Sequence, residues 1–222
     1  SSIDIPASVL SVGEYAFTYC SDLSKVTLHN GTQTIGQSAF YDCRNLSSVT
    51  LPESLVSIGQ SAFSSCTSLT SVVVPKNIKT IETGTFRGCS SLTNIVLPDS
   101  LVTIGESAFR GCGMSQIRIP DNVSVFGSSA FSECVNLTSV ATPKSMAHIA
   151  NSAFYGCSNM TSVTIPEGVT TIGANAFHLC NLLSLSLPQS LTTIAGEGSS
   201  TGAFSDNKNL SVVVIPDNVT TV

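Results

Sequence analysis

A period of about 23 residues runs through the chain and restricts it to repeat architectures. Phenylalanine recurs at steps of 22 or 23 residues, with one last step of 27, at Phe17, Phe40, Phe63, Phe86, Phe109, Phe131, Phe154, Phe177 and Phe204. A cysteine follows three residues after each of the first eight, and Asn207 takes that place in the ninth. Proline keeps a third register from Pro6 to Pro216, in which His29 replaces one proline. Three registers with one period predict a solenoid of stacked units.

One unit reads Leu-x-x-Val-x-Leu-Pro-x-x-Leu-x-x-Ile-Gly-x-x-Ala-Phe-x-x-Cys, as in residues 46–66. Val49 and Leu51 alternate with polar residues, which predicts a strand with one buried face. Pro52 lacks an N–H group and ends that strand. Ile58 before Gly59 predicts a second, shorter extended segment that turns at the glycine. The Ser-Ala-Phe-x-x-Cys segment is long enough only for a single turn, which we expect to be 3₁₀.

A single unit cannot bury its own apolar side, so we expect the units to stack in register. Ten strands, from residues 3–5 to residues 213–215, would then form one parallel sheet with neighbours about 4.8 Å apart. Each repeated residue becomes a column, and the phenylalanine column becomes the main packing element. The eight cysteines become a column of buried free thiols, because stacked thiols lie too far apart for disulfides. They also lack the Cys-x₂-Cys pairs of zinc sites.

Charge and motifs argue against several classes of function. The net charge is −5 with only nine Lys and Arg, which does not provide the basic surface of a nucleic-acid binder. No apolar run approaches the ~20 residues that a membrane helix needs. The three histidines fall in three different registers, and no phosphate-binding loop, serine-hydrolase motif or zinc-protease motif is present. We therefore expect no catalytic residue, no cofactor and no metal site.

Carboxylates after the prolines leave one enzymatic alternative open. Asp99 and Asp121 follow the prolines of neighbouring units and would come close after stacking. A glycosidase needs two carboxylates about 5 to 9.5 Å apart in a groove. Here the acids form a row on a turn, where Asp and Glu are common because they keep the edge soluble. We therefore interpret the row as a solvated rim, and a polysaccharide-active solenoid stays a minor alternative.

The spacing Leu-x-x-Val-x-Leu is that of leucine-rich repeats, and the full unit, with Pro after the strand and Ile-Gly-x-x-Ala-Phe-x-x-Cys behind it, closely resembles the BspA-like leucine-rich repeats. The resemblance covers essentially the whole chain. It implies a right-handed, curved solenoid with a parallel sheet on the concave face. It also implies a cell-surface or secreted protein of a host-associated bacterium or anaerobic protist. Members of the family are linked to adhesion to host matrix proteins and to other cells.

The outward strand positions form the face on which leucine-rich repeats usually bind. This face is rich in hydroxyl groups and nearly uncharged, with an apolar step at two neighbouring valines and one arginine beside them. Ser and Thr are also good exposed strand residues, so a purely structural role stays open. Aromatic residues are absent from the face, which argues against stacking on sugar rings. The candidate binding residues are Thr27, Thr50, Val73, Val96, Arg118, Thr164, Ser48, Ser71, Asn94 and Gln116.

We expect residues 1–222 to form one leucine-rich-repeat solenoid of about nine 22- to 23-residue units, with a five-residue insertion at 196–200. The chain lacks the polar caps of complete solenoids, so we expect a fragment of a longer array whose ends are prone to self-association. The leading hypothesis is a non-enzymatic adhesion or recognition module for a protein or glycan ligand, such as host extracellular matrix. The alternative is a structural spacer that presents another domain.

Overall fold

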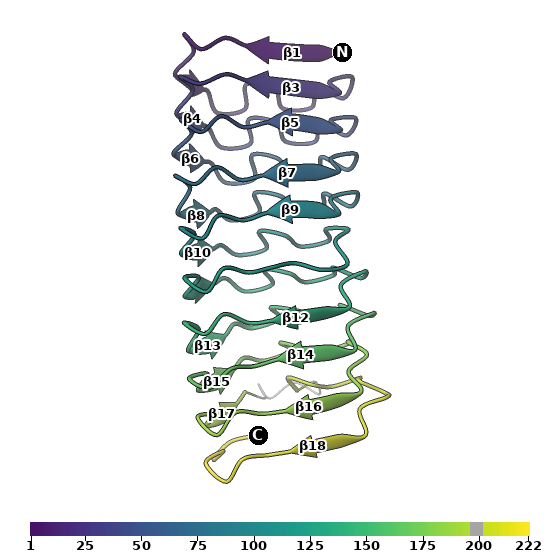
Figure 1. Ribbon diagram of the computed structural model, residues 1–222. Coiled ribbons are helices and arrows are strands. Elements are labelled where there is room, and N and C mark those ends of the chain that lie inside the picture. The colour runs from purple at the N-terminus through teal and green to yellow at the C-terminus, as the bar shows by residue number, and fades with distance from the viewer. Residues whose placement is uncertain (196–201) are drawn as a thin grey trace.

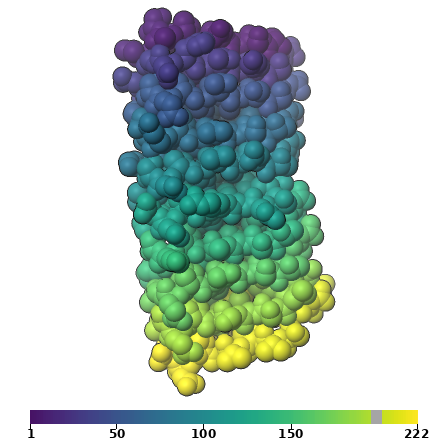
Figure 2. Space-filling model, viewed as in Figure 1, coloured from purple at the N-terminus to yellow at the C-terminus, as the bar shows by residue number. Residues whose placement is uncertain are grey.

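The computed structural model describes residues 1–195 and 202–222, so the predicted insertion at 196–200 lies outside the described residues. The chain winds into coils that stack in one column, as Figure 1 shows, and Figure 2 shows the coils in contact from one end of the column to the other. The described residues contain strands and turns but no helix. None of them therefore forms a helix long and apolar enough to cross a membrane. The predicted repeat solenoid with parallel strands is confirmed.

The longer strands lie on one side of the column, which we call the strand face (Figure 1). They pair in parallel with the repeat register, so that Ile3 lies beside Val26 and Val26 beside Val49. The inward residues of these strands pack into the core and the outward ones meet solvent. The strands are β1 (Ser2–Ile5), β3 (Lys25–Leu28), β5 (Ser48–Thr50), β7 (Ser71–Val73), β9 (Asn94–Val96), β12 (Ser139–Ala141), β14 (Ser162–Thr164), β16 (Ser184–Ser186) and β18 (Val212–Val214).

The prediction of ten strands in one sheet is wrong in two respects, because one of the ten strands does not form and the strand pairing is interrupted twice. Residues 116–118 form no strand, and β1-β3-β5-β7-β9, β12-β14 and β16-β18 are separate sheets. Each interruption follows a coil that is one residue shorter between its cysteine and its next apolar residue, before Met114 and before Leu182. The shortened loop shifts the backbone that follows it. The backbone N–H and C=O groups of the next strand therefore no longer face the groups of the preceding strand with which they would pair.

A second set of strands, two residues long, runs along another side of the column. They pair in three groups, β2-β4-β6, β8-β10-β11 and β13-β15-β17. They correspond to the predicted second extended segment before each glycine. The strands are β2 (Ser11–Val12), β4 (Thr34–Ile35), β6 (Ser57–Ile58), β8 (Thr80–Ile81), β10 (Thr103–Ile104), β11 (Val125–Phe126), β13 (His148–Ile149), β15 (Thr171–Ile172) and β17 (Thr193–Ile194).

Glycine after six of the nine short strands allows adjacent coils to approach closely. The N–H of Gly59 donates to the carbonyl of Ile35 at 2.8 Å, and a Cβ on Gly59 would lie 2.6 Å from a backbone nitrogen of the preceding coil. Glu82 and Ala150 replace this glycine in the two coils where the pairing of short strands is interrupted. Ala195 also replaces it but retains its backbone bond. Two of the three residues that replace this glycine, Glu82 and Ala150, thus lie where one sheet of short strands ends and the next begins.

The segment around each phenylalanine forms the side of the column that we call the turn face. The expected 3₁₀ turn is wrong, because the backbone here alternates in handedness, with positive φ at Ser38 (51°) and Asp42 (57°). This alternation aims every second N–H at the next coil. Phe40 donates to the carbonyl of Ala62 and Asp42 to that of Ser64, both at 2.8 Å. The turns are therefore hydrogen-bonded from coil to coil, which a 3₁₀ turn would not achieve.

The repeated phenylalanines form the predicted core column. Neighbouring rings stack with centroids 5.2 to 5.7 Å apart and interplanar angles of 16° or less. The seven rings from Phe40 to Phe177 are fully buried. Offset stacking of this kind adds to the free energy of burial.

The repeated cysteines are buried free thiols, as predicted, with Cys20 of the first coil exposed. The seven buried thiols each have a hydrogen-bonding role that the sequence did not reveal. Cys66 donates its S–H to the carbonyl of Phe40, 3.2 Å away in the preceding coil. Asn207 takes over this role in the ninth position, since its Nδ2 donates to the carbonyl of Phe177 at 2.8 Å. The replacement of cysteine by asparagine therefore preserves the bond between coils.

We predict that Phe86→Ala lowers the free energy of unfolding by about 3–5 kcal/mol, because it leaves a ring-sized cavity between two stacked neighbours. Phe17→Ala should cost clearly less, because Phe17 is only half-buried in the first coil. Urea unfolding followed by circular dichroism measures both. Equal losses from the two substitutions would contradict the stacked column.

We also predict that one of the eight thiols, that of Cys20, reacts quickly with Ellman's reagent in the folded protein. Burial raises the pKa of Cys43 to about 11 and that of Cys89 and Cys134 to about 12, so their reactive thiolates are scarce at pH 8. All eight should react in denaturant. The fast phase of the reaction should disappear in Cys20→Ala. A second fast-reacting thiol, or a fast phase that persists in Cys20→Ala, would contradict the buried column.

Candidate binding face

The ten candidate residues line the strand face in two adjacent columns. Nine of them are exposed and Thr27 is half-buried. The register places Ser48 beside Ser71 and Ser71 beside Asn94. Thr27 lies beside Thr50 in the other column, as predicted. The structure thus brings these residues onto one surface, and Gln116 and Arg118 join it from a segment that is not a strand.

Val73 and Val96 form the predicted apolar step. They are direct neighbours in the pairing of β7 with β9, and their exposed fractions are 66% and 49%. Side chains of this kind on a parallel sheet lie about 4.8 Å apart, so the two valines present one continuous apolar surface. Hydroxyl and amide side chains surround it, including those of Thr50, Ser71 and Asn94.

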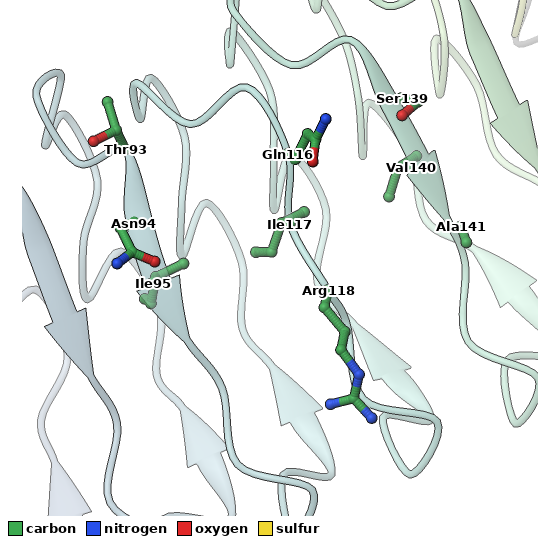
Figure 3. Close-up of a pocket in the computed structure, with 9 residues that line it drawn as sticks. All are labelled: Thr93, Asn94, Ile95, Gln116, Ile117, Arg118, Ser139, Val140 and Ala141. Atoms are coloured by element: carbon green, nitrogen blue, oxygen red, sulfur yellow. The ribbon is translucent and has the colours of Figure 1, made fainter.

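A depression of about 370 Å³ opens on the strand face where the strand pairing is interrupted. Figure 3 shows that it lies between β9 and β12, with the backbone of residues 116–118 crossing it. Ile95 and Ile117 are half-buried there, as are Val49 and Val163 at the same register in paired strands, whereas Val26 and Val72 are buried. The lining residues are Thr93, Asn94, Ile95, Gln116, Ile117, Arg118, Ser139, Val140 and Ala141.

The missing strand also leaves backbone groups available at this depression. Residues 116–118 form no ladder with β9 or β12 in the described part of the chain. Backbone N–H and C=O groups are strong hydrogen-bonding groups that need a partner, which here is solvent or a ligand. The depression therefore combines a partly apolar floor with free backbone groups and polar side chains at its rim.

Arg118 is the single cationic side chain among the ten candidates, and it is held by an acid. Its Nη1 donates to Oδ1 of Asp99 at 2.9 Å, and this hydrogen bond raises the pKa of Arg118. Both side chains are largely exposed, so the pair contributes little to stability. It orients the guanidinium at the lower edge of the depression in Figure 3. The same ion pair engages the carboxylate of Asp99, which is one of the two acids that a glycosidase activity would need.

The sequence missed the floor of the depression. Ile95 and Ile117 occupy inward positions of the repeat, where the pattern predicts full burial, but both are half-buried; Val140 beside them is buried as the pattern predicts. The one signal was the residue missing before Met114, which marked an irregular unit but not the direction of the backbone shift. Among the described residues, no three His, Cys, Asp or Glu side chains lie close enough to hold a metal ion.

The sequence pattern described as the BspA type leucine rich repeat region matches in six copies, over residues 1–101 and 79–211. No curated protein matches the chain. A leucine rich cell surface protein from Faecalibacterium prausnitzii A2-165 is 28% identical with a TM-score of 0.67, covering 100% of this chain and 69% of that one.

Two further solved structures have the same fold. The T. pallidum leucine rich repeat protein is 29% identical with a TM-score of 0.58, covering 81% of this chain and 76% of that one. The pneumococcal vaccine antigen PcpA is 22% identical with a TM-score of 0.65, covering 100% of this chain and 67% of that one. With the family pattern matched along nearly its full length, the chain belongs to the BspA-type leucine-rich-repeat family.

Proposed function

We propose that this chain is a non-enzymatic recognition module that binds a protein ligand through its strand face, at the surface of the cell. The family and the F. prausnitzii structure, which is described as a cell surface protein, support the location. The depression between β9 and β12 carries the proposal, because it offers a shaped site at one of the two places where the strand pairing of this face is interrupted.

The chemistry of the depression suits a polypeptide. Its half-buried Ile95 and Ile117 can accept an apolar side chain of the ligand. The free backbone groups of residues 116–118, with Asn94 and Gln116, can hydrogen-bond a peptide backbone, as in other modes of recognition of extended peptides. Val73 and Val96 extend the apolar surface beside it. A sugar ring is less suited to this site, since aromatic side chains are absent from its lining.

Rigidity favours binding to such a face. Each coil is held by backbone bonds to both neighbours, so a ligand meets a preformed surface and little conformational entropy is lost at the interface. Adhesion to a host extracellular-matrix protein is the finer form of this proposal, and the family resemblance supports it. A spacer would need the rigid column alone and would not need the depression.

We predict that Val73→Asp/Val96→Asp abolishes binding of a matrix protein while the fold is retained, because two charges would be desolvated in an apolar contact. Biolayer interferometry of the 222-residue chain against fibronectin, laminin, fibrinogen and collagen tests this prediction. The same experiment with a panel of cell-surface glycans tests the glycan alternative.

Val56→Asp/Val102→Asp is the matched control, since these valines are similarly exposed, at 52% and 40%, but lie beside the short strands and not on the strand face. The control should bind like the unmodified chain. Equal loss in both variants would contradict a site on the strand face. Silence of the well-folded chain across the panel would favour the spacer.

A further inference from the structure

The turn face carries a feature that the strand face lacks, because all four tyrosines of the chain lie there. Tyr15, Tyr19, Tyr41 and Tyr155 occupy positions within two residues of a core phenylalanine. Tyr15 and Tyr19 are 55% and 67% exposed. Tyr19 and Tyr41 meet edge to face, with centroids 5.6 Å apart and planes at 90°. This contact fixes the orientation of the Tyr41 ring.

A hollow of about 320 Å³ lies beside Tyr41 and spans parts of four successive coils. Gly84 lies in it, at a position where neighbouring coils have Ser61 and Ser107. The backbone there is left-handed, with φ of 62°, and Gly84 has no side chain to occupy the hollow; a Cβ at this position would lie 3.1 Å from Oγ of Ser61. The volume is at the small end of the range for ligand sites, which begins at about 300 Å³.

The hydroxyl and amide groups around the hollow are not used by the protein itself. Within the part of the chain that the structure describes, the side chains of Gln60, Ser61 and Ser107 make no hydrogen bond to other residues. Hydroxyls elsewhere in the column commonly do, such as that of Ser47, which donates to the carbonyl of Ser24 at 3.1 Å. The unused groups can therefore both donate to and accept from a ligand.

One cation, Arg87, and one anion, Glu106, complete the lining. The corresponding arginine of the next coil, Arg110, lies outside the lining and is held by Glu133 through two hydrogen bonds of 2.7 and 3.1 Å. Arg87 lies in the hollow and forms no ion pair among the described residues. Glu106 also lines the hollow. An anion would meet the carboxylate of Glu106, and an apolar ligand would leave the hydroxyls without partners.

We propose that this hollow is a second binding site, specific for a neutral carbohydrate, with one sugar ring against Tyr41. A pyranose offers many hydroxyls that both donate and accept, which matches the serines, Gln60, Arg87 and Glu106. It also has an apolar C–H face that packs on an aromatic ring. The site lies on the turn face and is independent of the strand-face proposal. The two sites would let the module contact a protein and a glycan at once.

Fluorine NMR of the chain labelled with 3-fluorotyrosine tests the proposal, because the four tyrosines give four signals. The probes are the methyl glycosides of glucose, galactose, mannose, fucose and N-acetylglucosamine. We expect at least one glycoside to shift the Tyr41 signal saturably, with a smaller shift of Tyr19 and none of Tyr155. Absence of a saturable shift with every glycoside would overturn the proposal. So would a stronger response to inorganic phosphate or acetate.

Substitutions by residues that occur at the same position in other units should keep the fold. Ser64 holds the position of Tyr41 and Arg87 in its own unit, which gives the variants Tyr41→Ser and Arg87→Ser. Asn175 holds the position of Gly84, which gives the variant Gly84→Asn, whose side chain should fill the hollow. Arg87→Ser and Gly84→Asn should each weaken sugar binding about tenfold or more. Tyr41→Ser should also weaken sugar binding, measured by saturation-transfer NMR, whereas the matched control Tyr155→Ser should not.

Equal sugar affinity in all four variants would overturn the site. Val73→Asp/Val96→Asp, on the strand face, should leave sugar binding unchanged.

Discussion

Hydrogen bonds between successive coils, made at one repeated register, are the constraint on which the rest of the structure depends. Most coils donate backbone N–H groups to their neighbours along the strands and along the turns, and seven cysteine thiols close a further bond between coils. Because these bonds recur at the same place in most coils, they favour a nearly constant length of the unit and small residues where coils approach. The phenylalanine stack follows from that register, since rings placed at one position in every coil must lie one above the other.

The proposed binding sites lie where single residues depart from the repeat. On the strand face, the residue missing before Met114 moves residues 116–118 out of the ladder and opens a depression. On the turn face, Gly84 at a position usually held by serine leaves a hollow beside Tyr41. In both cases the regular coils on either side remain hydrogen-bonded and hold the site rigid. A solenoid can thus gain local specificity by a change in one coil while the column stays intact.

The sequence predicted the stacking and the buried columns because a strict period determines which residues become neighbours. The thiol column and the nearly continuous strand face followed directly from it. The depression did not, because a shortened loop can be accommodated by several backbone shifts and only packing decides among them. The alternating handedness of the turns was also missed, since residues such as Ser38 and Asp42 carry no strong signal for positive φ. Asn207 illustrates the same limit: its amide replaces the thiol bond, which spacing alone does not reveal.

The interruption of strand pairing at residues 116–118 is the central structural claim, and hydrogen exchange measured by NMR tests it most directly. Amides paired within the five-stranded sheet, such as those of Val26 and Val72, should exchange slowly because both neighbouring coils protect them. The amides of Gln116, Ile117 and Arg118 should exchange much faster, since no ladder holds them. Slow exchange of these three amides, equal to that of the paired strands, would contradict the open depression and the binding site proposed there.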